Sequence, residues 1–174
     1  MMPHQLNWQE ICQMIPKRKA DAQKGDFGRL LCITGSRNMP GACLLSTQAA
    51  LRGGAGLVTV ATAPENPMRL AAAAPEAMWL PLETDEAGFL RSSDQNRKTL
   101  EKQLSRANAV LLGCGLGVTE ETRRLVHWVL EQTVCPVVLD ADGLNCAVSC
   151  IELSRRTGKD WILTPHPGEM ARLT

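Results

Sequence analysis

Short segments made almost wholly of apolar residues alternate with helix-like segments along most of this chain. Within these segments, apolar and polar residues do not alternate. Such continuous apolar runs are typical of strands buried on both faces of a parallel sheet. The pattern predicts an α/β fold with three αβα layers, a mostly parallel central sheet and right-handed crossovers. The expected strands are 29–34, 57–61, 77–82, 109–112, 136–139 and 161–163, and the expected helices are 7–15, 40–53, 66–74, 98–105, 119–132 and 170–173.

Composition narrows the functional classes. The 174 residues suffice for one domain, and its core must be aliphatic because the chain has four Trp, two Phe and no Tyr. A formal net charge of +1 provides no basic field for nucleic acid or for an anionic membrane. No apolar run approaches the roughly 20 residues of a membrane span. Seven Cys, an odd number without a Cys-x-x-Cys pair, indicate buried free thiols and a cytoplasmic protein.

Four of the expected strands end in residues suited to ligand binding. In parallel α/β sheets, ligands bind beyond the carboxyl ends of the strands. The strand ends are followed, in chain order, by GS (35–36), GCGLG (113–117), DADGLN (140–145) and TPHPGE (164–169). The sequence therefore predicts a small-molecule site on one edge of the sheet.

The glycine-rich segment lies between an expected strand and an expected helix. Gly113, Gly115 and Gly117 would let backbone N–H groups approach an anion at the start of that helix. A tight strand–helix turn explains the same glycines equally well. Val118 stands where a dinucleotide fingerprint needs its last glycine, which argues against a Rossmann dehydrogenase.

Two acids, Asp140 and Asp142, come directly after a strand. They could hold Mg²⁺ through water, bind hydroxyl groups or act as a base. Alternatively, Asp142 is the N-cap of a helix that begins at Gly143. Asp140 needs a partner or partial solvation, because burial of an unpaired carboxylate is costly.

His166 and Glu169 flank Pro167-Gly168, a sequence that fits the start of a helix with proline in its first turn. One interpretation is a capped helix with a surface histidine. The two neighbouring prolines fix the direction of His166, which favours a functional role. Lys24 and Asp26 either close over a ligand or form a solvated turn, and the turn is the favoured interpretation.

Seven motifs together resemble one family, the ADP/ATP-dependent NAD(P)H-hydrate dehydratases. The resemblance covers residues 20–174 and leaves 1–19 as an N-terminal helix and linker. It implies a ribokinase-like fold and a metabolite-repair reaction, in which the nucleotide phosphorylates the hydroxyl of hydrated NADH or NADPH and the phosphate is then eliminated. The motifs, in family order, are KGDFG (24–28), TGS (34–36), PGA (40–42), ALRGGAGLVT (50–59), GCGLG (113–117), LDADGLN (139–145) and LTPHPGEMARL (163–173).

The resemblance also implies roles for single residues. Ala42, His166 and the glycine turn, chiefly Gly115, would contact the hydrated dinucleotide. Glu169 would organise Mg²⁺ and phosphate, as the acid of an Asn-x-x-Glu motif in which His166 takes the Asn position. Asp140 and Asn145 would support the phosphate end. The implied cofactors are ADP or ATP with Mg²⁺, and full-length relatives are commonly homotetramers.

Two departures from the family pattern matter. Cys114 replaces a proline that usually lies between the first two glycines. The family continues into a nucleotide site with a Gly-Thr/Ser-Gly-Asp turn, and no such turn occurs here. We therefore expect the catalytic Asp beyond Thr174, and a chain that alone folds poorly and has negligible dehydratase activity. The alternatives are another ribokinase-like small-molecule kinase and a non-catalytic dinucleotide-binding remnant.

Overall fold

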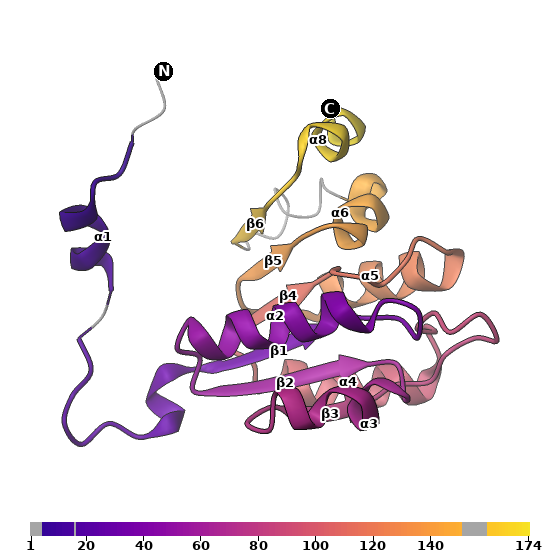
Figure 1. The fold of residues 1–174 in the computed structure, drawn as a ribbon. Helices are drawn as coiled ribbons and strands as arrows, with labels where there is room; N and C mark the ends of the chain where they lie inside the picture. The colour runs from indigo at the N-terminus through magenta and orange to yellow at the C-terminus, as the bar shows by residue number, and fades with distance from the viewer. Residues whose placement is uncertain (1–4, 16, 151–159) are drawn as a thin grey trace.

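The computed structural model describes residues 5–15, 17–150 and 160–174, and its centre is a parallel sheet (Figure 1). The sheet has six strands in the order β3-β2-β1-β4-β5-β6, and every neighbouring pair is parallel. The predicted α/β fold is confirmed. The strands are β1 (Arg29–Ile33), β2 (Leu57–Thr62), β3 (Met78–Pro81), β4 (Ala109–Leu112), β5 (Val137–Leu139) and β6 (Trp161–Leu163).

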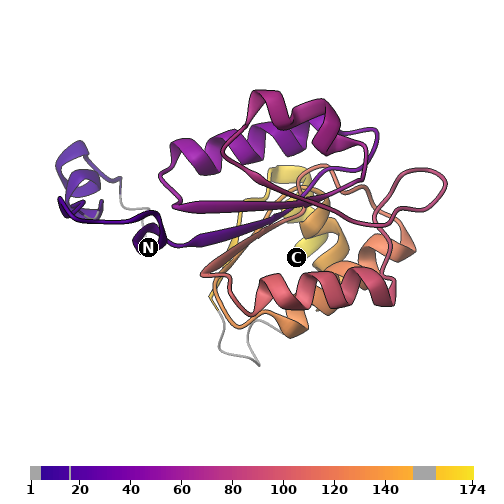
Figure 2. The same ribbon diagram turned by 90° about the horizontal axis from the view of Figure 1, so that it is seen from below.

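Helices cover both faces of the sheet, as Figure 2 shows. α2 and α3 lie on one face, and α4 and α5 lie on the other. None of the helices in the described part of the chain has the length and apolar character needed to cross a membrane. The helices are α1 (Trp8–Met14), α2 (Pro40–Arg52), α3 (Asn66–Leu70), α4 (Asp94–Leu104), α5 (Glu120–Gln132), α6 (Asp142–Ala147) and α8 (Pro167–Leu173), with short 3₁₀ turns η1 (Lys24–Phe27), η2 (Ala71–Ala73) and η3 (Val148–Cys150).

Alternate residues of each strand enter opposite cores. In β1, Leu31 and Ile33 pack into a large core with α4, α5 and α6, whereas Cys32 packs into a smaller core with α2 and α3. Each apolar side chain that is fully buried contributes roughly 1.5–3 kcal/mol. Because both faces are covered, apolar residues are needed at consecutive positions, and this explains the continuous apolar runs.

Helix α4 begins at Asp94, and the prediction of a start at Lys98 was wrong. Ser93 is the N-cap, and its side chain accepts a hydrogen bond from the N–H of Asn96. The first turn is polar, so it carries no apolar periodicity that the sequence could reveal. An N-cap serine with extended backbone defines the start instead.

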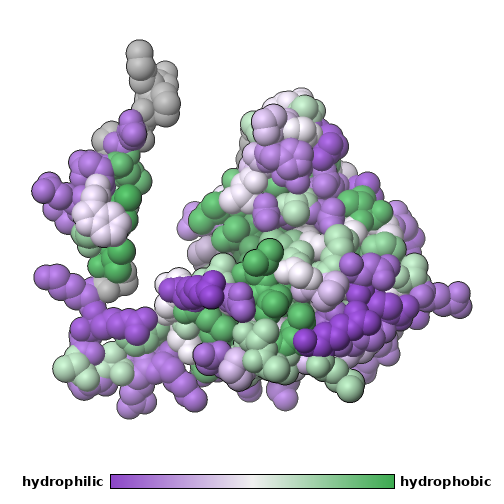
Figure 3. All heavy atoms as spheres, in the orientation of Figure 1, coloured by the Kyte–Doolittle hydropathy of each residue, from purple (hydrophilic) through white to green (hydrophobic). Residues whose placement is uncertain are grey.

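The N-terminal part lies apart from the ligand-binding edge. Helix α1 has no buried residue, and Figure 3 shows hydrophobic side chains exposed along this segment. Lys24 and Asp26 lie in η1, are exposed and precede β1 directly. They are therefore at the amino edge of the sheet, opposite to the carboxyl ends of the strands, and the interpretation as a solvated turn is confirmed.

Candidate functional site

The strand order reverses between β1 and β4. After β1 the chain enters α2 on one face, and after β4 it enters α5 on the other. The two loops are joined by backbone hydrogen bonds: Gly35 N–H donates to the Cys114 carbonyl (2.9 Å) and Ser36 N–H donates to that of Gly115 (2.6 Å). Such a switch point is where open α/β sheets bind ligands. The predicted motifs therefore do meet at one edge.

Gly115 touches the first turn of α2. Its φ of +69° is left-handed, and a Cβ atom there would lie 2.8 Å from the Cβ of Ala42 and 3.1 Å from that of Met39. Only glycine tolerates this conformation at so close an approach. The structure thus brings together Gly115 and Ala42, two of the residues that were assigned to substrate binding.

Free hydrogen-bond donors gather at this contact. The N-cap residue of α2, Met39, makes no side-chain cap, and Pro40 occupies the first turn. Within the described residues, no atom accepts a hydrogen bond from the N–H groups of Gly41, Ala42 or Gly115. An uncapped N-terminus of a helix of 13 residues carries partial positive charge. Backbone groups arranged in this way can bind a phosphate or another anion.

The other two glycines of the turn are required by packing. Gly113 has φ +133° and lies against the backbone of Asp140 and Gly143. Gly117 has φ +77° and lies against the ring of Phe89. The tight-turn interpretation is therefore confirmed for both residues. Their contact with a ligand stays a prediction.

Asp142 is not the N-cap of α6, as one interpretation had it. The cap position is Ala141, whose φ of +51° makes it the one non-glycine residue with positive φ in the described chain. Asp142 is the first helical residue, and its carboxylate accepts a hydrogen bond from Gly117 N–H (2.8 Å). The helix therefore begins one residue before Gly143, the expected start, and its first carboxylate bonds to the glycine turn. Strained backbone of this kind is common at functional sites.

Asp140 links three neighbouring strand ends. Its side chain is half-buried. One carboxylate oxygen accepts from Thr164 Oγ1 (2.8 Å) after β6, and the other accepts from Cys114 Sγ (3.3 Å) after β4. Burial raises the pKa of the Cys114 thiol to about 11, and the Asp140 carboxylate adds to the rise. The thiol is thus protonated at neutral pH and acts as a donor. The expectation that Asp140 needs partners or solvent is confirmed.

His166 is the N-cap of α8, so the capped-helix interpretation is confirmed. Its Nδ1 accepts from the N–H groups of Gly168 (3.1 Å) and Glu169 (3.4 Å). The other ring nitrogen, Nε2, lies 3.2 Å from Glu169 Oε1. The His166 side chain is 64% exposed, and its contact with a substrate stays a prediction.

The residues assigned to phosphate and Mg²⁺ are not assembled into one cluster. The side chain of Asn145 accepts from Arg172 Nε (2.7 Å), whereas both oxygens of the buried Glu169 are engaged with His166. In the described part of the chain, no three His, Cys, Asp or Glu residues lie close enough to hold a metal ion. Because Mg²⁺ needs only one or two carboxylates together with phosphate oxygens, the role of Glu169 as a ligand stays a prediction.

A buried polar cluster beside the loop after β1 was not predicted. Asn66 Nδ2 donates to Thr62 Oγ1 (2.7 Å) and to the Ser36 carbonyl (3.2 Å). The hydroxyls of Thr34 and Ser36 are buried and have no partner within the described residues. A buried hydroxyl left unpaired costs about 1–3 kcal/mol, so these groups mark a place for a bound polar atom. The signal was present in the TGS motif after the first strand.

Comparisons with known proteins agree with this arrangement. Residues 30–174 match the family model Carb_kinase, described as NAD(P)H-hydrate dehydratase. The chain is 40% identical over 168 residues to the bifunctional NAD(P)H-hydrate repair enzyme Nnr of Coxiella burnetii. The aligned region covers 97% of this chain and 31% of that protein. 

The chain also resembles solved structures. A ribokinase-like superfamily protein of Enterococcus faecalis has a TM-score of 0.79 and 27% identity, over 97% of this chain and 55% of its own. An ADP/ATP-dependent NAD(P)H-hydrate dehydratase of Bacillus subtilis, co-crystallised with ATP and Mg²⁺, has a TM-score of 0.70 and 30% identity, over 95% and 54%. The ribokinase-like fold is confirmed, and the chain spans about half the length of these two structures.

Proposed function

Because the chain belongs to the NAD(P)H-hydrate dehydratase family, we propose that it supplies the dinucleotide-binding side of an enzyme that dehydrates hydrated NADH and NADPH with ADP or ATP. One observation carries the proposal. Gly115 lies against the first turn of α2, beside N–H groups that have no acceptor within the described residues. This contact joins two motifs of the family at the switch point of the sheet, where a dinucleotide can bind.

The role proposed for this chain is to bind and orient. The N–H groups at the uncapped start of α2 would donate hydrogen bonds to an anionic or carbonyl oxygen of the dinucleotide, and Ala42 would lie against it. Asp140 would hold the glycine turn through Cys114 and the segment before α8 through Thr164. His166 would contact the dinucleotide from the start of α8, as the resemblance implies.

Transfer of the phosphoryl group requires parts that we expect outside these residues. In the proposed reaction, the terminal phosphoryl group of the nucleotide moves to the ring hydroxyl. The C–O bond then breaks, phosphate leaves and the ring loses a proton to a base. An anion hole and a base normally contribute most of such catalysis. We propose that the base is an Asp beyond Thr174. Mg²⁺, when bound, would neutralise the negative charge of the phosphates.

Three further assignments belong to the same proposal. Residues 20–174 would be the N-terminal part of the dehydratase domain, and residues 1–19 an appended helix and linker. The whole enzyme would be a homotetramer, since this is common in the family. A cytoplasmic location is supported by the seven cysteines, all of which are free thiols.

Calorimetric titration of the chain with hydrated NADPH tests the proposal. We expect saturable binding that Gly115→Ala removes and that Gly25→Ala leaves unchanged, because Gly25 lies at the amino edge with no atom within 4 Å of an added Cβ. With ADP and Mg²⁺ added, the near-ultraviolet absorbance of the reduced ring should not return.

Each other outcome has a defined meaning. Turnover at the rate of a complete enzyme would show that the base is not beyond Thr174. Binding of hydroxymethylpyrimidine instead of hydrated NADPH would favour the small-molecule kinase. A lack of any binding of hydrated NADPH would refute the proposed role.

A further inference from the structure

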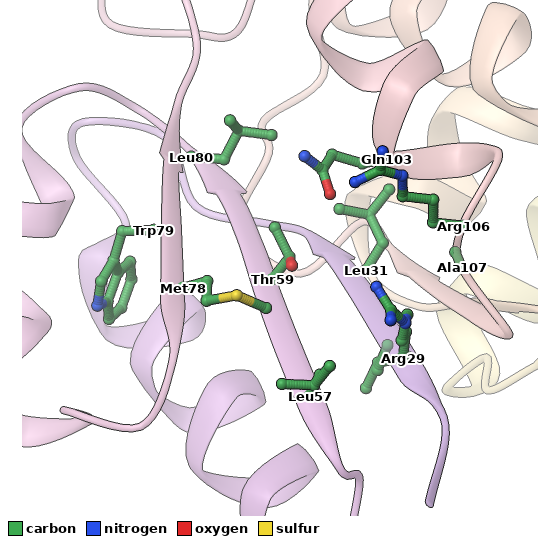
Figure 4. Close-up of a pocket in the computed structure, with 11 residues that line it drawn as sticks. Arg29, Leu31, Leu57, Thr59, Met78, Trp79, Leu80, Gln103, Arg106 and Ala107 are labelled. Atoms are coloured by element: carbon green, nitrogen blue, oxygen red, sulfur yellow. The ribbon is translucent and has the colours of Figure 1, made fainter. Parts of the chain in front are cut away.

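A concavity lies at the opposite end of the strands from the proposed dinucleotide site. It has a volume of about 270 Å³ and opens over the amino halves of β1, β2 and β3, on the face covered by α4 (Figure 4). Neither the glycine turn nor the start of α2 contributes to its lining. It is therefore separate from the proposed dinucleotide site, and a ligand in one would not occupy the other.

The floor of this pocket is set by strand register. Leu31, Thr59 and Met78 are consecutive partners across β1, β2 and β3, so they form one row on the same face of the sheet. Leu57 lies next to the row at its amino side. The indole of Trp79 lies on the far side of β3, in the other core (Figure 4). The floor is apolar apart from a single hydroxyl, that of Thr59.

The wall of the pocket comes from the end of α4. This helix packs on the sheet through Leu100 and Leu104, which are buried, and it ends at Leu104. Gln103 and Arg106 line the pocket from this end, and Arg29 lines it from the start of β1 (Figure 4). The amino half of the sheet is thus left partly uncovered, with polar side chains around an apolar floor.

The charge of the rim is wholly positive. Arg29 and Arg106 are both among the lining residues, and no Asp or Glu is. Within the described residues, neither guanidinium pairs with a carboxylate. Arg37, by contrast, pairs with Glu65 at 2.7 Å. An apolar floor beside two cations without counter-ions is complementary to a molecule that combines a hydrocarbon body with one negative charge.

We propose that this pocket binds a small amphipathic monoanion, with the carboxylate of a short-chain fatty acid as the simplest example. The hydrocarbon chain lies over Leu57, Leu31 and Met78, where burial of each CH₂ group is favourable. The carboxylate lies between Arg29 and Arg106. The volume of 270 Å³ is just below the range of about 300–1,000 Å³ found for sites of drug-sized ligands, so the ligand is short.

The test uses the whole chain with hexanoate and 1-hexanol, two probes of equal chain length that differ in charge. The readout is the ¹³C-methyl NMR signal of Met78, assigned by Met78→Leu. Hexanoate should shift this signal in a saturable way and bind at least about tenfold more tightly than 1-hexanol, since hydrogen bonds to charged groups are the stronger ones. Hydrated NADPH should not shift the Met78 signal. A wrong proposal for this pocket can therefore be distinguished from a wrong proposal for the dinucleotide site.

Variants locate the charge effect. Arg29→Gln with Arg106→Gln should weaken hexanoate binding about tenfold or more and leave 1-hexanol unchanged. Arg124→Gln is the matched control, because Arg124 is exposed on α5 and pairs with Glu120 and Glu121. Gln103→Glu keeps a good helix former and should also remove hexanoate binding, by supplying the anion itself.

Three results would overturn the proposal. Hexanoate and 1-hexanol could bind equally, which would make the pocket a merely apolar groove. The double arginine variant, with a native spectrum, could bind hexanoate as before. Hexanoate could also fail to shift Met78 in a saturable way. If the double variant does not fold, the Gln103→Glu variant decides the question.

Discussion

Replacement of Gly115 by alanine is the most direct test of the contact between the glycine turn and the start of α2. At φ +69°, an L-residue costs about 1–2 kcal/mol relative to glycine. The new Cβ would also lie 2.8 Å from Ala42 Cβ and 3.1 Å from Met39 Cβ, both in or next to the first turn of α2. Overpacking of this kind typically costs about 1–3 kcal/mol. We therefore expect a loss of about 2–5 kcal/mol in the free energy of unfolding.

Equilibrium unfolding in urea, monitored by circular dichroism, measures this loss. A typical domain is stabilised by roughly 5–15 kcal/mol, and this chain alone is expected to be less stable, so the midpoint should move clearly. To relieve the clash between the added Cβ and the Cβ atoms of Ala42 and Met39, the start of α2 must move away from the glycine turn. The same substitution should therefore abolish binding of hydrated NADPH even where the protein is still folded.

Gly41→Ala is the matched control. Gly41 lies in the same turn of α2, and a Cβ added there meets no atom within 4 Å. In a helix, alanine is favoured over glycine by about 0.5–1 kcal/mol, so this variant should be slightly more stable. If Gly115→Ala changed the free energy of unfolding by less than about 0.5 kcal/mol, the close approach of the glycine turn to α2 would be wrong.

Three other predictions follow from particular bonds. Asp142→Ala should lower the free energy of unfolding by about 1.5–3 kcal/mol through loss of the bond to Gly117 N–H, and Asp142→Asn should lower it less. His166→Ala should cost about 0.5–2 kcal/mol because α8 loses its N-cap, and His166→Asn should restore most of this. Burial raises the pKa of Cys114 to about 11, so Ellman's reagent at pH 8 should modify the exposed Cys12 quickly and Cys114 slowly in the native chain.

The thiols of Cys114 and Cys150 also make the free energy of unfolding depend on pH. Burial raises the pKa of Cys114 and Cys150 to about 11, from an ordinary value near 9. The unfolded chain therefore loses these protons first. The stability that they contribute is fully present below pH 9 and is lost as the pH rises towards 11. Urea unfolding at several pH values should show this decline, and Cys114→Ser should reduce its slope.

Contrary results would be informative for each of these. Equal stability of Asp142→Ala and the unsubstituted chain would mean that the glycine turn is held without the carboxylate. A His166→Asn variant as unstable as His166→Ala would exclude a capping role. Rapid native modification of Cys114 would show that its thiol is not held by burial beside Asp140.

Much of the fold could be predicted from the sequence. The continuous apolar runs predicted six strands because burial on both faces requires apolar residues at every position. The helix at 170–173 was predicted, with Pro167 suited to a first helical turn, and α8 begins at that proline. The start of α4 was missed, since a serine cap before a polar turn gives no periodic signal.

The candidate site could be predicted only in part. Strand ends in a parallel sheet share one edge, so the motifs that follow them had to lie near one another. The partners of each side chain were not predictable. Asp142 bonds to Gly117, Asp140 to Cys114 and Thr164, and Asn145 to Arg172.

The sequence by itself determined which segments form strands, which turns need glycine and which strand ends bear polar groups. These properties depend on short-range sterics and on the period of burial, which neighbouring residues set. Only the tertiary structure decided that Gly115 meets the start of α2, and that Arg29 and Arg106 share one pocket. The reason is that such contacts depend on strand order and register, and these are chosen by the packing of both cores as a whole.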